Sequence, residues 1–251
     1  MQRSICLVAL MLTVAGKALT TEERCKILEY HRKMREDVVP EARNMLLMSY
    51  STELEELAQN WLESCAFTFP YDQPEYHDVA HFVLLGTGDQ PVSCETVGEF
   101  VSLKQHYNYT INDCTKPCYQ YKRMVWATTD KVGCSQKLCQ NSIFFPKPQY
   151  IFTCFYKPAD VMMKDRPYLS GSICTECPQG FSCYRKQCTN LTSLATDTCT
   201  PLTLTTPVAT TEAVGRTTIK TTSTSTSLSA CIFLNNASLI VFAFAYVVVL
   251  H

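Results

Sequence analysis

Residues 119–134 read Tyr-Gln-Tyr-Lys-Arg-Met-Val-Trp-Ala-Thr-Thr-Asp-Lys-Val-Gly-Cys, and this stretch is the most informative about the fold of the chain. Residues 122–137 are rich in β-branched and aromatic side chains. Residues 149–156 have the same character, and Pro146 and Pro148 lie between the two runs. Runs of this kind, separated by turn-forming residues, are typical of strands in an antiparallel sheet. The two runs therefore predict the centre of a sheet.

Two amphipathic helices are predicted before this sheet. Thr20 and Glu23 have the spacing of a capping box, and an apolar face follows at three- and four-residue steps, formed by Ile27, Tyr30, Met34 and Val38. A second pair with capping-box spacing, Thr52 and Glu55, opens a run with the same period, formed by Leu54, Leu57, Ala58, Trp61, Leu62 and Cys65. Both stripes predict helices with one face buried in the core.

The rest of the chain divides by composition. A third helix over residues 95–106 completes a predicted three-layer α/β/α sandwich spanning residues 19–160, which is long enough to bury a core. Residues 161–188 hold four cysteines and have too few apolar residues to fold without disulfides, as in a cysteine-rich hinge. In residues 189–230, 16 threonines and 5 serines make up half of the 42 residues. Such a segment predicts an unfolded, O-glycosylated stalk.

Both ends of the chain carry sorting signals. Residues 1–18 combine a basic residue, a short apolar run and small residues, as in a secretory signal peptide. Residues 231–251 end in an apolar run that is shorter than the ~20 residues of a spanning helix and follows small residues, which favours a glycosylphosphatidylinositol (GPI) attachment signal. We expect a secreted protein held by a GPI anchor on the extracellular side of the plasma membrane; a single-pass C-terminal transmembrane helix is the alternative.

Composition excludes several classes of function. Of 15 cysteines, Cys6 and Cys231 fall in the end segments, and most of the other 13 are expected to form disulfides in an oxidising compartment. The 22 Lys and Arg residues nearly balance the 23 Asp and Glu residues, so no basic excess points to nucleic acid. Neither a Gly-x-Ser-x-Gly nor a His-Glu-x-x-His motif is present. We therefore expect no catalytic residue and no cofactor.

Residues 119–134 resemble the signature segment of the CAP superfamily, the cysteine-rich secretory, antigen 5 and pathogenesis-related 1 proteins. That segment usually reads Gly-His-Tyr-Thr-Gln-Val-Val-Trp-Ala, and here residues 124–127, Met-Val-Trp-Ala, and residues 132–134, Val-Gly-Cys, match the family in order. The resemblance covers residues 20–188 and implies the three-layer α/β/α fold. The hinge entry and the tail are similar to the lipid-anchored, peptidase inhibitor 16-like members.

In this family two histidines and two glutamates line a central cavity that binds a divalent cation. The resemblance places other residues at these four positions: Phe69, His81 (or Phe82, depending on the gap), Leu103 and Gln120. Because aromatic, aliphatic and amide groups replace carboxylates and imidazoles, we expect no metal there. A replacement site of His77 and His81 with Asp78 or Asp89 requires a helical segment, and no helical pattern surrounds these residues.

The resemblance also implies disulfide pairings and leaves two cysteines without a family position. It implies Cys65–Cys139, Cys134–Cys154 and a local Cys114–Cys118 bond, with Cys174–Cys183 and Cys177–Cys188 in the hinge. Cys25 and Cys94 fit no common family position, and we expect them to pair with each other, which leaves Cys199 over. Two N-glycosylation sequons, at Asn108 and Asn190, lie in the mature chain.

These features predict a non-enzymatic, surface-tethered CAP protein that binds an extracellular lipid or protein ligand. Phe69, Leu103 and Phe82 would give an apolar cavity, which suits a hydrophobic ligand. Alternatively, these side chains fill the cavity and the outer surface recognises the partner. A protease inhibitor, or a hydrolase, is the alternative function.

Overall fold

A computed structural model describes residues 18–199, except for residues 67, 89, 141–145 and 196. The predicted signal peptide up to residue 17, the stalk beyond residue 199 and the predicted attachment signal lie outside the described residues. Within the described part of the chain, no helix is both long and apolar enough to cross a bilayer.

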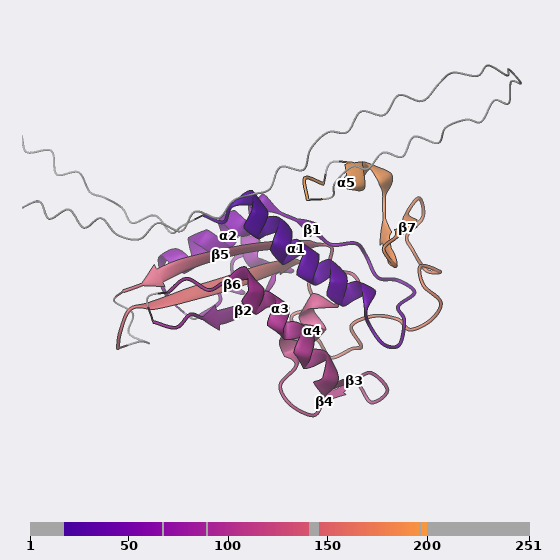
Figure 1. Cartoon of the computed structure of the whole chain (residues 1–251), viewed down its shortest axis with the longest axis horizontal. Helices are drawn as coiled ribbons and strands as arrows, with labels where there is room; N and C mark the ends of the chain where they lie inside the picture. The colour runs from indigo at the N-terminus through magenta and orange to yellow at the C-terminus, as the bar shows by residue number, and fades with distance from the viewer. Residues whose placement is uncertain (1–17, 67, 89, 141–145, 196, 200–251) are drawn as a thin grey trace, which may run out of the picture. The chain divides into compact units, whose positions relative to one another are not determined.

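A four-stranded sheet forms the centre of the domain (Figure 1). Its strand order is β1 (Ser49–Tyr50), β5 (Lys131–Cys139), β6 (Gln149–Lys157) and β2 (Ala80–Leu85). Strand β6 is antiparallel to both β5 and β2, and β1 is parallel to β5. The predicted pairing of the two strand-forming runs is confirmed, with Cys134 directly opposite Cys154.

The first part of the predicted strand 122–137 is wrong. Tyr119–Met124 forms the short helix α4, and the strand begins only at Lys131. The reason lies in the spacing of the buried residues: Tyr121, Met124 and Val125 are all buried, and steps of three and four residues put them on one helical face. The alternation that a half-buried strand needs is absent from this part of the segment.

The helices differ from prediction mainly at their ends. Helix α1 (Thr21–Glu36) has the predicted capping box, in which the Thr20 hydroxyl accepts from the Glu23 amide and Glu23 accepts from the Thr20 amide. Helix α2 (Thr52–Glu63) is instead capped by Ser51, whose hydroxyl accepts from the Leu54 amide. The predicted third helix consists of α3 (Cys94–Glu99) and the 3₁₀ helix η2 (Phe100–His106).

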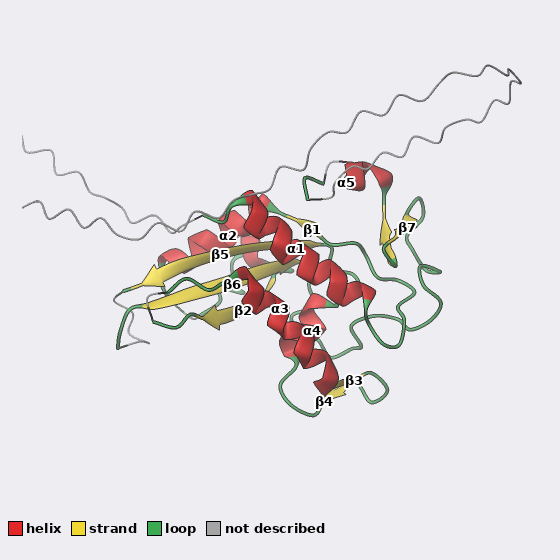
Figure 2. Ribbon diagram, viewed as in Figure 1, coloured by secondary structure: helices red, strands yellow, loops and turns green. Residues whose placement is uncertain are grey.

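Helices cover both faces of the sheet (Figure 2). Residues of β6 show the two faces, since Phe152, Cys154 and Tyr156 lie in one apolar cluster with α1 residues, whereas Ile151 and Phe155 lie in another with α2 residues. Strand residues alternate between faces, so the predicted three-layer α/β/α order is present. Gly133 allows α2 to approach closely, because a Cβ atom there would lie 2.3 Å from the Glu55 amide nitrogen.

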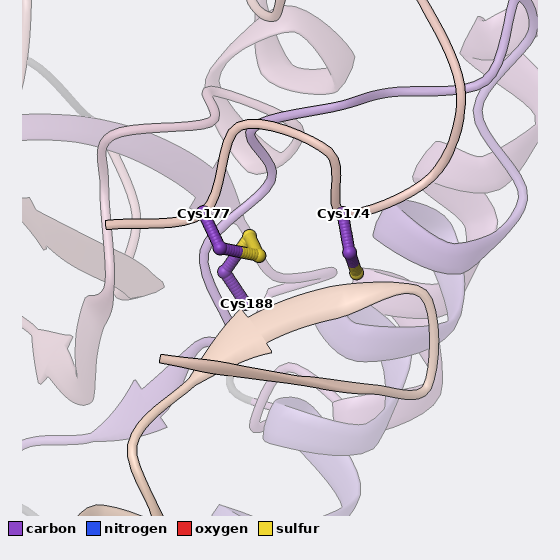
Figure 3. Close-up of side chains that lie close together, drawn as sticks. All are labelled: Cys174, Cys177 and Cys188. Atoms are coloured by element: carbon purple, nitrogen blue, oxygen red, sulfur yellow. A yellow bond between two sulfur atoms is a disulfide. The ribbon is translucent and has the colours of Figure 1, made fainter. Parts of the chain in front are cut away.

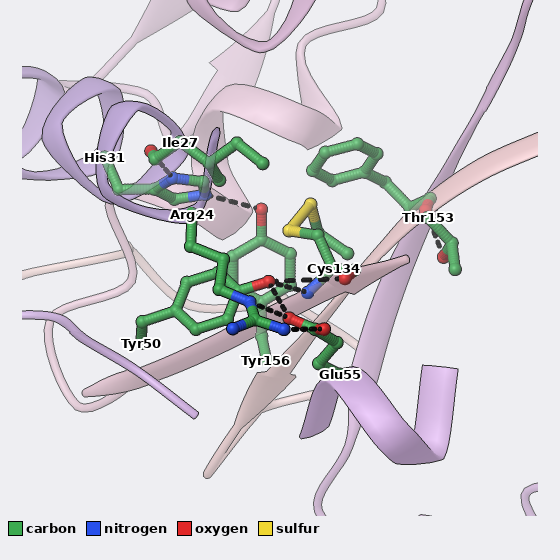
Figure 4. The surroundings of a disulfide bond; sticks show 10 residues. Arg24, Ile27, His31, Tyr50, Glu55, Cys134, Thr153 and Tyr156 are labelled. Atoms are coloured by element: carbon green, nitrogen blue, oxygen red, sulfur yellow. Dashed lines mark hydrogen bonds and ion pairs between the residues drawn. A yellow bond between two sulfur atoms is a disulfide. The ribbon is translucent and has the colours of Figure 1, made fainter. Parts of the chain in front are cut away.

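Two buried side chains of α1 hold the layers together. The Arg35 guanidinium donates to the carbonyl oxygens of residues 46, 124, 126, 127 and 129. The His31 imidazole contacts the Ile27 carbonyl oxygen through Nδ1 and the Tyr156 hydroxyl through Nε2, each at 2.7 Å (Figure 4). Both residues are almost fully buried, so their role is structural.

Figure 4 also shows the surroundings of the Cys134–Cys154 disulfide. Tyr50 donates its hydroxyl hydrogen to Glu55 at 2.6 Å and accepts from the Cys134 amide at 3.1 Å. Arg24 of α1 donates to both carboxylate oxygens of Glu55. Glu55 therefore joins α1 to α2 across the end of the sheet, and this contact replaces the capping role predicted for it.

Shorter elements complete the domain and lead into the C-terminal segment. They are η1 (Pro74–Tyr76), the hairpin of β3 (Tyr107–Asn108) and β4 (Asp113–Cys114), the hinge hairpin of β7 (Ser182–Tyr184) and β8 (Gln187–Thr189), and α5 (Leu191–Ala195). The described residues at the start of the predicted stalk, 189–195 and 197–199, are folded: Thr189 is buried in β8, and Asp197 forms a buried ion pair with Arg32. We call residues 189–199 the strap.

Five of the six disulfides in the described residues have the pairings that the family resemblance implies. The predicted Cys25–Cys94 bond is wrong, because Cys25 is bonded to Cys199 and Cys94 is a buried free thiol. Cys25 shares a face of α1 with Arg32, two turns on, and this face contacts the strap. Cys94 instead lies beside Lys26 and Glu23, on the face of α1 turned towards α3.

Candidate functional site

The sulfur atoms of Cys174, Cys177 and Cys188 lie within 4.8 Å of one another in the hinge (Figure 3). Cys177 is bonded to Cys188, and Cys174 is bonded to Cys183. A cysteine binds a metal ion as a thiolate, whereas the sulfur atoms of these three cysteines are all in disulfides. The three cysteines therefore cross-link the hinge, and in this disulfide-bonded state they offer no metal site.

The four positions that the family resemblance assigns to the cavity do not form one lining. Phe69 is buried and stacks on the His81 ring, with ring centroids 4.0 Å apart and planes 4° apart. Trp61, Tyr76 and Phe155 surround this pair. The stacked rings thus belong to the apolar cluster between the sheet and α2.

The other cavity positions lie elsewhere. Phe82 and Leu103 pack in the cluster on the opposite side of the sheet, under α1. Gln120 is half-buried at the start of α4. The expectation of a cavity relined jointly by Phe69, Phe82 and Leu103 is therefore wrong, because strand β2 directs neighbouring side chains to opposite faces.

The segment 74–81 does not bring its two histidines onto one helical face. His77 is exposed at the end of the 3₁₀ helix η1, and His81 lies in strand β2. Of the proposed third ligands, Asp78 is exposed and Asp89 lies outside the described residues. The helical geometry that a replacement metal site requires is thus absent from this segment.

A groove of about 460 Å³ lies between α1 and the α3–η2 segment. Its apolar part is formed by Tyr30, Met34, Gly98 and Val101, and its charged part by Lys33, Asp37, Glu95, Glu99 and Lys104. Gly98 permits the close approach of the two helices, because a Cβ atom there would lie 2.7 Å from the Tyr30 ring. The groove has an apolar floor with charges beside it.

A second hollow, of about 640 Å³, continues from this groove. The two share Val101 and Lys104, and the second adds Val39, Tyr107 and Tyr121. Val101 and Val39 are 46% and 70% exposed, so both hollows present apolar side chains at the surface. Helical periodicity gave no signal for these residues, because they lie in a 3₁₀ helix and in a loop.

Three side chains of the types that enzymes use have shifted pKa values. Burial lowers the pKa of His31 to about 4, and both of its ring nitrogens have partners. Burial raises the pKa of the Cys94 thiol to about 11, which disfavours the nucleophilic thiolate. His81 also has a pKa lowered to about 4, first by burial and then by the nearby Arg123.

The low pKa of His31 predicts a loss of stability in acid. Its unfolded pKa is about 6.5, so between pH 6.5 and pH 4 the unfolded chain binds a proton that the folded chain excludes. The free energy of unfolding therefore falls as the pH falls through this window, by about 2 kcal/mol at pH 5. Urea unfolding at pH 7 and pH 5 measures this, and His31→Gln should lose about 2 kcal/mol less than the unmodified chain. His77→Gln, at an exposed position, is the control. If His31→Gln lost as much free energy of unfolding between pH 7 and pH 5 as the unmodified chain, the prediction would be wrong.

The two sequons lie in different surroundings. Asn108 is exposed in the β3–β4 hairpin, where its side-chain oxygen accepts from the amides of Thr110 and Ile111. Asn190 is half-buried just before α5. Glycosylation of either remains a prediction.

The sequence matches the cysteine-rich secretory protein (CAP) family over residues 28–156. This chain belongs to the CAP family. It is 30% identical over 181 residues to glioma pathogenesis-related protein 1 of Mus musculus, a match that covers 68% of this chain and 67% of the relative. It is 29% identical over 175 residues to peptidase inhibitor 16 of Bos taurus, which covers 68% of this chain but only 37% of that longer protein.

Solved structures confirm the CAP fold. Na-ASP-1 superposes with a TM-score of 0.56 at 20% identity, over 70% of this chain and 49% of that protein. The structure of NaASP2 with Zn²⁺ superposes with a TM-score of 0.52 at 23% identity, over 70% of this chain and 98% of the other. At these identities the likeness concerns the fold alone.

Proposed function

We propose that this CAP-domain chain is a secreted, GPI-anchored protein that binds a lipid in the groove between α1 and α3 and catalyses no reaction. The proposal includes the loss of the family's His/Glu tetrad and a place among the peptidase inhibitor 16-like members. The observation that carries it is the apolar groove, with exposed Val101 at its junction with the second hollow. Its volume is in the usual range for small-ligand sites, about 300–1,000 Å³.

The arrangement of charge around the groove supports an amphipathic ligand. Tyr30 and Met34 offer apolar contact, and charges of both signs lie beside them: Lys33 and Lys104, and Asp37, Glu95 and Glu99. Lys104 donates to the Asp37 carbonyl oxygen, which places its ammonium group at the end of α1. An acyl chain would bury its methylene groups at about 0.8 kcal/mol each, while its head group meets the lysines. The apolar floor therefore supports an acyl chain as the ligand, whose head group would meet charges of both signs.

The absence of catalysis rests on the inert groups described above. His31 is buried and hydrogen-bonded to Tyr156, the Cys94 thiol has a raised pKa, and the His81 ring stacks on Phe69. The hydroxyls of Thr20, Ser51 and Ser93 donate to nearby carboxylates, and each of these residues is the N-cap of a helix. Hydrolysis and protease inhibition remain the alternatives, and no contact or cluster in the described residues favours either.

Expression of the full-length chain in animal cells tests ligand and anchor together. Phosphatidylinositol-specific phospholipase C should release the protein from the cell surface, and mass spectrometry of the released protein should detect bound lipid. Val101→Glu should reduce the bound lipid at least tenfold, because it places a charge at the junction of the two hollows. The matched control is Ile111→Glu, at a 67% exposed site outside the groove.

Each arm of this experiment has its own contrary result. Protein that stays on the membrane after phospholipase treatment would contradict the anchor. Equal lipid content in Val101→Glu and Ile111→Glu would contradict the groove as the binding site.

A further inference from the structure

The hinge brings the sulfur atoms of four cysteines together. Those of Cys174, Cys177 and Cys188 lie within 4.8 Å of one another (Figure 3), and Cys183 joins them because it is bonded to Cys174. Four thiolates around a zinc ion, each about 2.3 Å from it, lie roughly 3.8 Å apart. The three sulfurs that the distance describes are therefore close to the spacing of a zinc site.

The four cysteines form two pairs on elements that face each other. Cys174 and Cys177 belong to a Cys-x-x-Cys loop. Cys183 and Cys188 lie directly opposite each other in the β7–β8 hairpin, so their side chains are on the same face of the hairpin. Each cysteine of the loop is bonded to one of the hairpin. Two closely spaced cysteine pairs are the usual ligand pattern of a structural zinc site.

The hairpin is held in place by contacts other than disulfides. Arg185 and Lys186 have φ angles of 49° and 57°, as a two-residue type I′ turn requires. The Cys188 amide donates to the Met45 carbonyl oxygen at 2.6 Å, and the Leu47 amide donates to the Cys188 carbonyl oxygen at 2.8 Å. The turn and these two hydrogen bonds keep both hairpin cysteines in position whether they are oxidised or reduced.

The Cys-x-x-Cys loop is also attached without its disulfides. The Glu176 amide donates to the Arg43 carbonyl oxygen at 2.9 Å, and the Glu176 carboxylate pairs with the Arg43 guanidinium at 3.1 Å. Before the loop, the Gly171 amide donates to the Glu41 carbonyl oxygen at 3.0 Å. Opening both disulfides therefore leaves four thiols that face one another, with the Arg43 cation near the loop.

We propose that the reduced hinge binds a zinc ion through the thiolates of Cys174, Cys177, Cys183 and Cys188. Two molecules of a dithiol reduce the two disulfides to four thiols and are themselves oxidised to disulfides. Zn²⁺ then displaces the four thiol protons and forms four Zn–S bonds, without any transfer of electrons. The site shares no residue with the α1–α3 groove, so it stands independently of the function proposed above.

Zinc uptake by the full-length protein, purified from animal cells with its disulfides intact, tests this site. Mild reduction with a phosphine opens the hinge, whereas Cys134, Cys139 and Cys154 are fully buried and their bonds are protected. Mass spectrometry after alkylation identifies the cysteines that have become thiols, and circular dichroism checks that the domain is folded. After removal of the phosphine, the reduced protein should bind one zinc ion per chain with nanomolar or tighter affinity. The oxidised protein should bind none.

Two double variants separate the hinge from the other thiols. Cys174→Ser with Cys183→Ser removes two ligands and should weaken zinc binding by about a hundredfold or more. Cys25→Ser with Cys199→Ser is the matched control, because it removes the same number of cysteines at another partly exposed disulfide and should leave zinc binding unchanged. Cys183→His, which keeps a zinc ligand at an exposed position, should retain stoichiometric binding and serves if the hinge variant does not fold.

Three results would overturn the proposal. The first is equal zinc affinity in the two double variants. The second is a lack of zinc binding by a chain whose four hinge cysteines are shown to be thiols. The third is equal zinc affinity in the oxidised and reduced forms of the unmodified chain.

Discussion

Replacing Arg35 with methionine is expected to lower the free energy of unfolding by about 4 kcal/mol or more, because it leaves buried carbonyl oxygens without donors. The Arg35 side chain is 1% exposed and donates to five backbone carbonyl oxygens, those of Leu46, Met124, Trp126, Ala127 and Thr129. Each acceptor left unsatisfied costs about 1–3 kcal/mol. Methionine fills a similar volume but donates no hydrogen bond.

Urea unfolding followed by tryptophan fluorescence measures this effect. Arg43→Met is the matched control, since Arg43 is partly exposed and pairs with Glu176 at the surface at 3.1 Å. An ion pair of this kind contributes about 1 kcal/mol or less. Arg35→Lys should fall between the two variants, because an ammonium group reaches fewer of the carbonyl oxygens. Equal losses in Arg35→Met and Arg43→Met would show that the buried guanidinium is dispensable.

Removing the Cys25–Cys199 disulfide by a double serine substitution is expected to cost about 3–5 kcal/mol. The bond joins residues 174 positions apart, so its loss frees a long loop in the unfolded chain, and the entropic effect grows with loop length. The strap should also detach from α1. Its buried Arg32–Asp197 ion pair would then be exposed to water.

The hinge offers a control for loop length. Cys174–Cys183 spans only 9 positions, and its removal should cost about 2.5 kcal/mol less than removal of Cys25–Cys199. Urea unfolding compares the two double variants. Limited proteolysis with mass spectrometry should show cleavage within residues 189–199 only in the Cys25–Cys199 variant. A strap that stays protected in that variant would contradict the role assigned to this bond.

Local patterns predicted the framework well where neighbouring residues decide the structure. The Thr20–Glu23 capping box and the apolar stripe of α1 involve contacts within one or two turns. The strands β5 and β6 also carry their own signal, because their composition differs from that of the segments around them. Helix α4 was missed because Tyr121, Met124 and Val125 are suitable for a strand by residue type and become helical through burial at steps of three and four.

The candidate sites were much less predictable. Sequence resemblance assigned Phe69, and His81 or Phe82, to family cavity positions, but the stacking of Phe69 on His81 depends on how η1, β2 and α2 pack. The groove between α1 and α3 exists because Gly98 of α3 packs closely against the Tyr30 ring of α1, a contact between residues far apart in the sequence.

The sequence by itself indicated a disulfide-rich chain of the kind found in secreted proteins. It also indicated the central antiparallel strands, the capped first helix and, through family resemblance, five disulfides. Only the tertiary structure decided that Cys25 bonds to Cys199, that the strap belongs to the folded domain, and that Phe69 stacks on His81. The physical reason is the range of the interactions. Caps and periodic stripes are local, whereas disulfide partners, ion pairs and grooves depend on which distant surfaces the packed layers bring together.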